Sequence, residues 1–331
     1  MERHQWDPRT ERPGDLVAPV RLDRTGASGP TTHQAAGRQW RQTSSGMYVP
    51  ASAPDHVDQR ILEQGSRIRS YGAVTAWAGL RWRGASFFDG TASGGEMLPI
   101  PLVTGPHELR PDRRVVITKT QLAPTERELV DGIWVATADR SVFDEVIRHG
   151  ERRQGIVDVE MAIAAGLLTV SDFRSYVDGR NAWTGVGLAR AAAGAAGLGC
   201  RSPQEVRMVL VWMWDADLPR PLCNVPLFDR DERLIAIVDL LDVEAGCVGE
   251  YQGADHKEGE RHRRDVAREQ KLRDHRLECF EVVGGDMQDR ELVAKRMVAA
   301  RERSRFEPPS RRTWTLRHPA WWAEWAAERG L

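Results

Sequence analysis

The run Leu234–Leu241 (Leu-Ile-Ala-Ile-Val-Asp-Leu-Leu) is apolar at every position except Asp239. A short apolar run with β-branched residues is typical of a central strand in a sheet. Around it the sequence predicts a helix, three strands, a helix, a strand and a final helix. These elements are expected at 204–214, 222–228, 234–241, 247–252, 259–275, 277–283 and 289–303. This part of the chain is therefore expected to be an α/β domain, with a mixed sheet flanked by helices, over residues 201–305.

The N-terminal part predicts two smaller pieces. Residues 1–20 are rich in Arg, Asp, Glu and Pro, which is typical of a disordered arm. Over 21–52, Pro30 suits the start of a short helix, and a turn at Gly46 leads into a strand. A helix, a basic connector and a hairpin predict a winged helix-turn-helix-like unit, with a polar helix-plus-strand as the alternative. Six residues of this unit are of types that suit contacts with phosphate groups and base edges: Thr31, Thr32, His33, Gln34, Arg38 and Arg41.

The middle of the chain, 53–200, predicts a separate α/β domain. Apolar spacing indicates helices at 57–68, 73–82, 139–148, 156–168, 171–177 and 182–195, and strands at 97–103, 114–119 and 128–136. A boundary is expected at 197–202, because Pro203 suits the first position of the next helix. With 331 residues, the chain has room for several such domains, so the expected class is multi-domain α/β or α+β.

The C-terminal tail, 306–331, is rich in tryptophan. It begins near the linker Glu307-Pro308-Pro309 and holds four of the twelve tryptophans. Trp321, Trp322 and Trp325 would lie on one side of a short helix. Exposed indoles favour aggregation, so we expect them to be buried on the chain's own C-terminal domain. Stacking on DNA bases is the alternative.

Composition limits the function classes. The net charge is −1, so nucleic-acid contacts must come from local basic patches. The four cysteines lie more than twenty positions apart, which argues against a zinc ribbon or a disulfide scaffold. No apolar stretch is long enough for a membrane helix, and the first residues do not resemble a signal peptide. A cytoplasmic protein is therefore predicted.

Carboxylates gather around the central strand. Asp239 lies in that strand, and the next strand carries Glu250 and Gln252, which point to the same face because side chains alternate. Glu205, on the preceding helix, can add a third carboxylate. Such an oxygen-rich set suits Mg²⁺ or Mn²⁺, which would activate water for phosphodiester hydrolysis. Chance spacing on a surface hairpin is the alternative.

The helix that follows is basic. Residues 257–276 hold eight Lys or Arg against five Asp or Glu. A cationic helix beside an acidic pocket suits a phosphodiester that contacts both. A solvated helix face with ion pairs between residues four apart, such as Arg261–Asp265, is the alternative.

These pieces resemble a known family. Asp239-Leu-Leu-Asp, Gly249-Glu-Tyr-Gln-Gly-Ala-Asp-His256 and Arg264-Asp-Val-Ala-Arg268 are similar to the Vsr-like endonuclease domains of the PD-(D/E)XK superfamily. The resemblance implies a restriction-endonuclease-like fold. It implies metal ligation by Asp239, Glu250 and Glu205, and contacts to phosphate from His256, Arg264 and Arg268. Gln252 stands where this superfamily often has lysine.

A second resemblance concerns the N-terminal half. Gly37-Arg-Gln-Trp-Arg-Gln, Gly46-Met-Tyr-Val-Pro and the stretch 130–144 are similar to AbiEi-type antitoxin regulators. The preferred interpretation is a DNA-binding protein with a Mg²⁺- or Mn²⁺-dependent endonuclease domain. The alternative is a non-catalytic regulator whose nuclease fold serves to bind DNA or a partner. The expected partners are DNA and a cognate toxin or defence-system protein, and the oligomeric state stays open.

Overall fold

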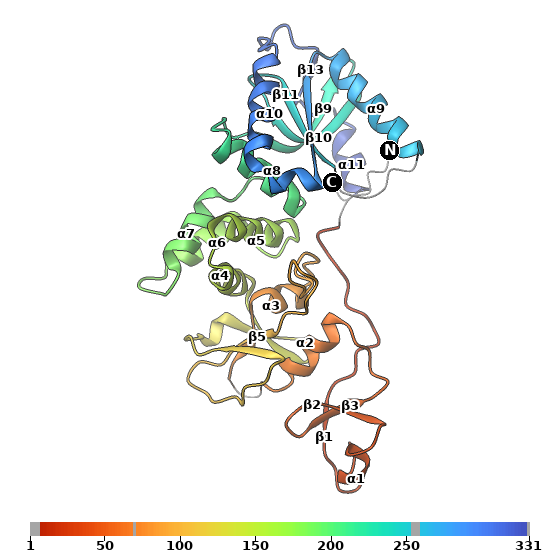
Figure 1. Cartoon of the computed structure of the whole chain (residues 1–331), viewed down its shortest axis with the longest axis vertical. Coiled ribbons are helices and arrows are strands. Elements are labelled where there is room, and N and C mark those ends of the chain that lie inside the picture. Colours follow the sequence, from red (N-terminus) through yellow and green to blue (C-terminus); the bar gives the residue numbers. More distant parts are fainter. Residues whose placement is uncertain (1–6, 69–70, 253–258, 330–331) are drawn as a thin grey trace. The chain divides into compact units, whose positions relative to one another are not determined.

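The computed structural model describes residues 7–68, 71–252 and 259–329, with the backbone alone over 259–266. The chain divides into two compact units, Met1–Gly197 and Leu198–Leu331. Together they form a mixed α/β protein whose described strands make three sheets, one antiparallel and two mixed (Figure 1). The sequence had indicated a boundary at 197–202.

The first sheet of unit 1 is antiparallel, with the strand order β1-β3-β2. Its region holds β1 (Val20–Arg21), α1 (Thr32–Ala35), β2 (Trp40–Ser44) and β3 (Met47–Pro50). The short helix and the hairpin predicted over 21–52 are present in that order, although α1 has only four residues. None of the residues of α1 is buried, so no packing favours a longer helix. The hairpin β2–β3 follows α1 where a wing was expected.

Residues 7–20 pack against unit 1, which corrects the prediction of a disordered arm over 1–20. The backbone N–H of Val17 donates to Oε1 of Gln59 at 2.9 Å, and Nε2 of Gln59 donates to the Val17 carbonyl at 2.8 Å. Gln59 is fully buried, so this pair of hydrogen bonds fixes the segment to the helix α2 (Val57–Gly65). Residues 1–6 lie outside the described part of the chain.

The second sheet of unit 1 is mixed, with the strand order β6-β5-β4-β8-β7. Helix α3 (Ala76–Trp82) packs against α4 (Ala138–His149). Helix α4 also packs against α5 (Arg152–Ala164) and α7 (Val186–Ala195). The elements are α2 (Val57–Gly65), β4 (Ala73–Val74), α3 (Ala76–Trp82), β5 (Ile100–Val103), β6 (Val115–Thr118), β7 (Arg127–Val130), β8 (Ile133–Ala136), α4 (Ala138–His149), α5 (Arg152–Ala164), α6 (Val170–Asp178) and α7 (Val186–Ala195).

A tight hairpin replaces the single strand that was predicted over 128–136. Asp131 and Gly132 have φ values of 43° and 86°, so both central residues of the turn are left-handed. An Asp-Gly pair in this conformation forms the two-residue turn that matches the twist of antiparallel strands. The chain therefore reverses between β7 and β8, which pair in register from Arg127–Ala136 to Val130–Ile133.

Unit 2 contains one five-stranded sheet with the order β12-β11-β10-β9-β13. Strands β11 and β12 are parallel, and the other neighbours are antiparallel. The predicted succession of helix, three strands, helix, strand and helix is confirmed. Its elements are α8 (Pro203–Leu210, continued by a π-helical turn over Val211–Asp215), β9 (Leu222–Asp229), β10 (Leu234–Asp242), β11 (Cys247–Gln252), α9 (Gly259–Asp274), β12 (Glu278–Val283), α10 (Arg290–Arg303), β13 (Trp314–Thr315) and α11 (Trp322–Ala327).

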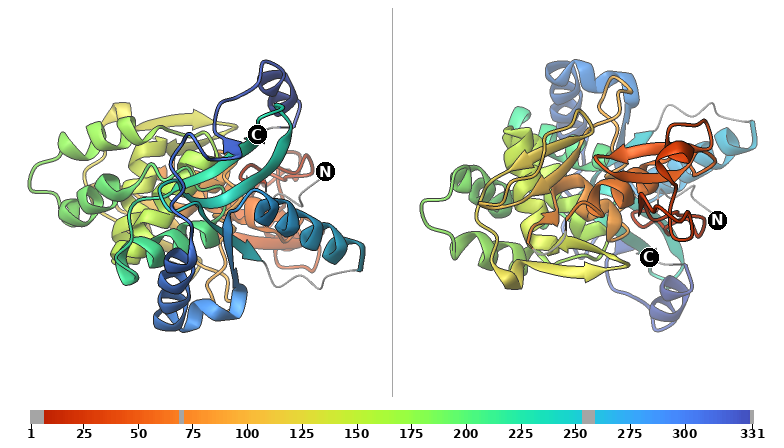
Figure 2. Two further views of the ribbon diagram at one scale, coloured as in Figure 1. Left: turned by 90° about the horizontal axis from the view of Figure 1, so that it is seen from above. Right: turned by 90° about the horizontal axis from the view of Figure 1, so that it is seen from below.

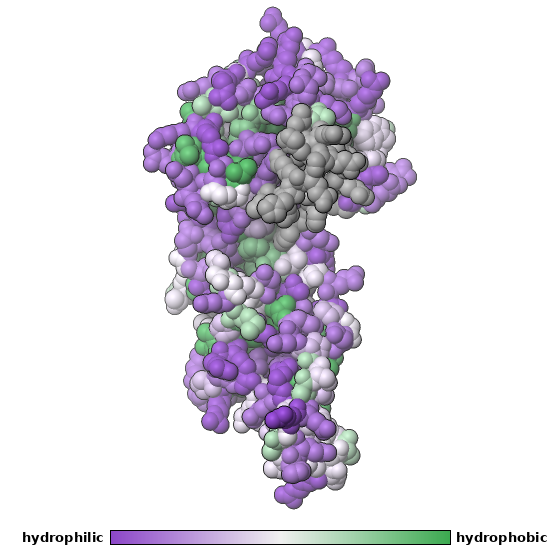
Figure 3. Space-filling view, turned by 45° about the vertical axis from the view of Figure 1, so that its right-hand side comes forward, coloured by the Kyte–Doolittle hydropathy of each residue, from purple (hydrophilic) through white to green (hydrophobic). Residues whose placement is uncertain are grey.

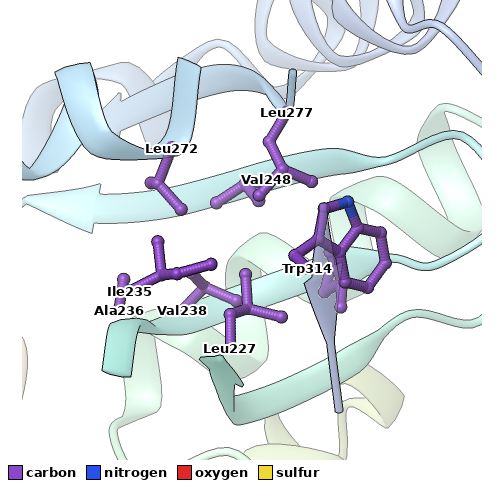
Figure 4. Close-up of a cluster of buried hydrophobic side chains, with 9 residues drawn as sticks. Leu227, Ile235, Ala236, Val238, Val248, Leu272, Leu277 and Trp314 are labelled. Carbon is purple, nitrogen blue, oxygen red and sulfur yellow. The ribbon is translucent and has the colours of Figure 1, made fainter. Parts of the chain in front are cut away.

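The sheet of unit 2 supports an apolar core that holds α9 in place. Leu272 of α9 and Leu277 just after it lie over Val248 and Val238 of the sheet, with Trp314 beside them (Figure 4). Full burial of each Leu or Val side chain contributes about 1.5–3 kcal/mol. This packing positions the C-terminal half of α9 beside β10 and β11, where the candidate carboxylates lie.

The tryptophan-rich tail docks on its own unit through Trp322, so the expected burial holds for this indole, whereas Trp321 is 38% exposed. Trp322 is 7% exposed and packs edge-on against Phe228 of β9, with a ring separation of 5.2 Å. Ile237 of β10 borders the same cluster, and the indole N–H of Trp321 donates to the Glu232 carbonyl at 3.2 Å. Figure 2 shows α11 beside the β9–β10 hairpin.

Replacement of the buried indole predicts a large loss of stability. We expect Trp322→Ala to lower the free energy of unfolding of unit 2 by about 3–5 kcal/mol, because it removes apolar contacts and leaves a cavity. Phe306→Ala is the control, since Phe306 is an aromatic residue of the same unit that is 43% exposed. It should change stability by about 0.5 kcal/mol or less. Hydrogen exchange of the β9 and β10 amides measures both. Equal protection in the two variants would contradict the docking of the tail.

In the part of the chain that the structure describes, no helix combines the length and the apolar character that crossing a membrane requires. Hydrophilic side chains predominate on the face drawn in Figure 3, and hydrophobic ones form small separate patches there.

Candidate functional site

Two buried carboxylates occupy neighbouring strands of unit 2. Asp239 of β10 is 4% exposed and Glu250 of β11 is 8% exposed. The strands are antiparallel, with Leu240 opposite Gly249, so Asp239 and Glu250 lie one position further along the same ladder. One Asp239 oxygen accepts the backbone N–H of Tyr251 at 2.9 Å. The structure therefore places the two predicted metal ligands side by side in the middle of the sheet.

Arg268 of α9 holds Glu250. Its Nη1 donates to Oε2 at 2.6 Å and its Nη2 to Oε1 at 2.8 Å, so both carboxylate oxygens are bound in a fork. The same guanidinium also donates to the carbonyl of Ile237. A predicted metal ligand and a predicted phosphate contact are thus paired with each other. Such a fork is a strong, geometrically specific ion pair.

Glu205 lies near Asp239 but supports the start of α8. Its carboxylate accepts the backbone N–H of Arg201 at 2.9 Å, the hydroxyl of Ser202 at 2.9 Å and the amide of Asn224 at 2.6 Å. Burial and the negative charge of Asp239 raise the pKa of Glu205 above its usual range. A glutamate three positions after a serine cap commonly stabilises the first turn of a helix. Its contacts therefore account for Glu205 without a metal ion.

The remaining residues of the predicted site are placed less centrally. The Gln252 amide donates to Oε1 of Glu281 on β12 at 2.6 Å, so it is occupied by a neighbouring strand. His256 lies outside the described residues, and so does the side chain of Arg264. Their predicted contacts with phosphate stay predictions.

Asp239 and Glu250 fit a hard divalent cation by their chemistry, since Mg²⁺ and Mn²⁺ prefer carboxylate oxygens. Two observations limit this fit. Within the described residues, Glu205, Asp239 and Glu250 do not form a set whose ligand atoms all lie within 4.8 Å of one another. Both oxygens of Glu250 are also bound by Arg268. A cation at Glu250 would therefore compete with Arg268 for the same two oxygens.

The predicted DNA contacts of unit 1 fall into two groups. Thr31 and Gln34 form a reciprocal capping box at the start of α1, with bonds of 2.8 and 3.3 Å, so their side chains serve the helix. Arg41 forks onto the buried Glu63 at 2.7 and 2.9 Å, which ties β2 to α2. The members of the predicted set outside these contacts are Thr32, His33 and Arg38, and all three are exposed, as Gln34 is too.

Comparisons of this chain with protein-family models, with curated proteins and with solved structures found no significant match. The resemblances to Vsr-like endonucleases and AbiEi-type regulators therefore stay predictions.

A second cluster of ionisable groups, which the sequence did not predict, joins α4 to α5. Nδ1 of His149 lies 2.7 Å from Oδ2 of Asp158 and 3.6 Å from Oε1 of Glu145. Within the described residues, Glu145, His149 and Asp158 form a group of potential metal ligands, because their ligand atoms all lie within 4.8 Å of one another. Asp158 lies between the buried residues Val157 and Val159 of α5. An acid at such a position requires a buried partner, and this is the signal that could have revealed the cluster.

The contacts of this cluster indicate a charge-balanced network rather than a cation site. Arg148 forks onto Glu145 at 2.5 and 2.7 Å, and the backbone N–H of Trp77 donates to the same carboxylate at 3.1 Å. Burial raises the pKa of Asp158 to about 6, while the hydrogen bond to His149 opposes that rise. The positive charges of Arg148 and of a protonated His149 balance the negative charges of Glu145 and Asp158.

This network predicts that unit 1 loses stability as the pH rises. Burial alone lowers the pKa of His149, but the hydrogen bond to Asp158 and the two nearby carboxylates outweigh it and raise the pKa above 6.5. The stabilising contribution is therefore complete below pH 6.5 and is lost as the pH rises through the folded pKa. Urea unfolding between about pH 6 and 8 should show this loss.

His149→Gln should flatten that dependence, and His33→Gln should preserve it, because His33 is an exposed histidine of α1. An unchanged slope in His149→Gln would contradict the assignment of the proton to this network.

Proposed function

We propose that unit 2 is a Mg²⁺- or Mn²⁺-dependent endonuclease-like domain that hydrolyses phosphodiester bonds in DNA. The observation that carries the proposal is the placement of buried Asp239 and Glu250 on adjacent strands, next to Arg268 of the basic helix α9. Two buried acids on one sheet are costly unless they serve a cation or a partner of opposite charge. An arginine at the same place suits the phosphate that such a cation would accompany.

The order of elements supports the same proposal. The succession α8, β9, β10, β11, α9, β12 agrees with the restriction-endonuclease-like core that the Vsr-like resemblance implies. In this proposal Asp239 and Glu250 bind the cation, and Arg268 contacts phosphate. A bound divalent cation would supply water activation and charge neutralisation at the phosphate. Glu205 is left out of the cation site, because its oxygens serve α8 and β9.

Conversion of supercoiled plasmid to nicked circles tests the proposal. The purified full-length protein should nick the plasmid with Mg²⁺ or Mn²⁺ and should leave it intact with EDTA. Mismatched and single-stranded DNA belong in the same series, because the target structure is open. If no substrate is cut with either metal, the endonuclease proposal is wrong.

The second candidate is a non-catalytic regulator of AbiEi type, in which the nuclease-like unit binds DNA, a cognate toxin or a defence-system partner. Two observations favour it: Arg268 occupies Glu250, and Glu281 occupies Gln252. A site that has no accessible metal ligands and no lysine suits binding of DNA better than its cleavage. DNA binding that persists in EDTA, together with intact plasmid in every metal, would favour this candidate.

A further inference from the structure

Glu250 has two competing uses in the proposed site. Arg268 takes both of its oxygens, at 2.6 and 2.8 Å, and also binds the carbonyl of Ile237. Three separate contacts fix the guanidinium over the carboxylate. The pair is largely removed from water, with 11% of the Glu250 side chain and 21% of the Arg268 side chain exposed.

A divalent cation and this guanidinium compete for Glu250. A cation would bind at about 2.0–2.6 Å to the same carboxylate oxygens that already accept the arginine N–H groups. The two positive charges would also repel each other strongly in a poorly hydrated site. Binding of a cation to Glu250 therefore favours transfer of Arg268 to another acceptor, because an unpaired buried charge is costly.

Phosphate is the acceptor that matches this geometry. A guanidinium binds carboxylate and phosphate with the same two-pronged arrangement of N–H groups. We infer that Arg268 exchanges Glu250 for a phosphate of DNA, so that DNA binding opens the site to the cation. This inference rests on the proposed function and adds to it a condition: the site gains cation affinity when the substrate is present.

Reciprocity makes the exchange measurable from either side. If DNA raises the affinity for the cation, the cation raises the affinity for DNA by the same factor. Removal of Arg268 abolishes the competition, so the DNA-free protein should then bind the cation more tightly. It should also abolish the coupling, because the exchanged residue is missing.

The experiment measures Mn²⁺ binding to the full-length protein by calorimetry, without DNA. We expect Arg268→Met to bind Mn²⁺ about tenfold more tightly than the unsubstituted protein, within the usual range of coupling between sites. Arg268→Lys should fall between the two, since an ammonium keeps the charge but cannot form the fork. Arg273→Met is the matched control, because Arg273 lies on the same helix and pairs with Glu269 at the surface.

A second measurement follows the affinity for a labelled duplex with phosphorothioate linkages, which slow its cleavage, by fluorescence polarisation with and without Mn²⁺. Mn²⁺ should tighten binding by about fivefold or more in the unsubstituted protein and in Arg273→Met, but not in Arg268→Met. Thermal melting identifies any variant that fails to fold, and Arg268→Lys then carries the test.

Equal Mn²⁺ affinity in the folded Arg268 variants and the unsubstituted protein would overturn the exchange, even if plasmid is nicked. The absence of Mn²⁺ binding in every protein, together with intact plasmid, would overturn the endonuclease proposal and the exchange with it. The two failures are therefore distinguishable.

Discussion

Asp239→Asn and Glu250→Gln are each expected to reduce metal-dependent nicking of plasmid to the background level. Each substitution neutralises a carboxylate that would bind the cation, and an amide oxygen is a much weaker ligand for a hard divalent ion. The fold should persist in Asp239→Asn, because the amide oxygen can still accept the Tyr251 N–H that lies 2.9 Å from the carboxylate. Gel analysis of nicked circles, normalised to folded protein, measures the loss.

Asp242 provides the matched control for this experiment. It lies on the same strand, is 5% exposed, and accepts from the backbone N–H of Glu244 at 3.0 Å and from Nε of Arg301 at 2.7 Å. Asp242→Asn should lower stability but keep the nicking rate per folded molecule. Nicking that survives in both site variants would show that this pair of acids is not the cation site.

The sequence predicted unit 2 well because its elements are built from local signals. The apolar run of β10 and the Ser202–Pro203 start of α8 define their elements within a few residues. Unit 1 was harder. Pro30 did mark the start of α1, but none of the residues of α1 is buried, so the helix ends after four residues. The Asp131-Gly132 pair is a hairpin signal, and it divides the single strand that was predicted there into β7 and β8.

The site shows where local reasoning ends. Asp239 and Glu250 could be named from the sequence because an acid in an apolar strand has few structural roles. The engagement of Glu250 by Arg268 depends on how α9 packs over the sheet through Leu272, which no spacing rule gives. The same holds for the pairing of His149 with Asp158, since it needs α4 and α5 to meet. Partners from different elements become visible only after packing is known.

A different buried ion network should dominate the stability of unit 1. Arg140 of α4 is fully buried, and its Nε lies 3.0 Å from both oxygens of Asp144. Its Nη1 donates to the Gln121 carbonyl at 2.7 Å and to Glu126 at 3.2 Å, and its Nη2 to the hydroxyl of Thr120 at 2.8 Å. Every nitrogen of the guanidinium is thus hydrogen-bonded, and the segment that precedes β7 is tied to α4.

Arg140→Met is expected to lower the free energy of unfolding of unit 1 by about 3–5 kcal/mol, because it leaves buried carboxylates without their compensating charge. Arg113→Met, at an exposed position, should cost about 0.5 kcal/mol or less. Hydrogen exchange of the α3 and α4 amides measures both changes. A deficit below about 1 kcal/mol in Arg140→Met would contradict the role of this network.

The double variant Arg140→Met with Asp144→Asn separates lost charge compensation from lost packing. The neutral amide removes the uncompensated charge, so the double variant should be more stable than Arg140→Met alone. Burial already raises the pKa of Asp144, and the loss of the Arg140 charge should raise it further. A raised folded pKa makes the protein more stable at low pH, so the deficit of Arg140→Met should shrink as the pH falls. A deficit that is independent of pH and unchanged in the double variant would assign the effect to packing.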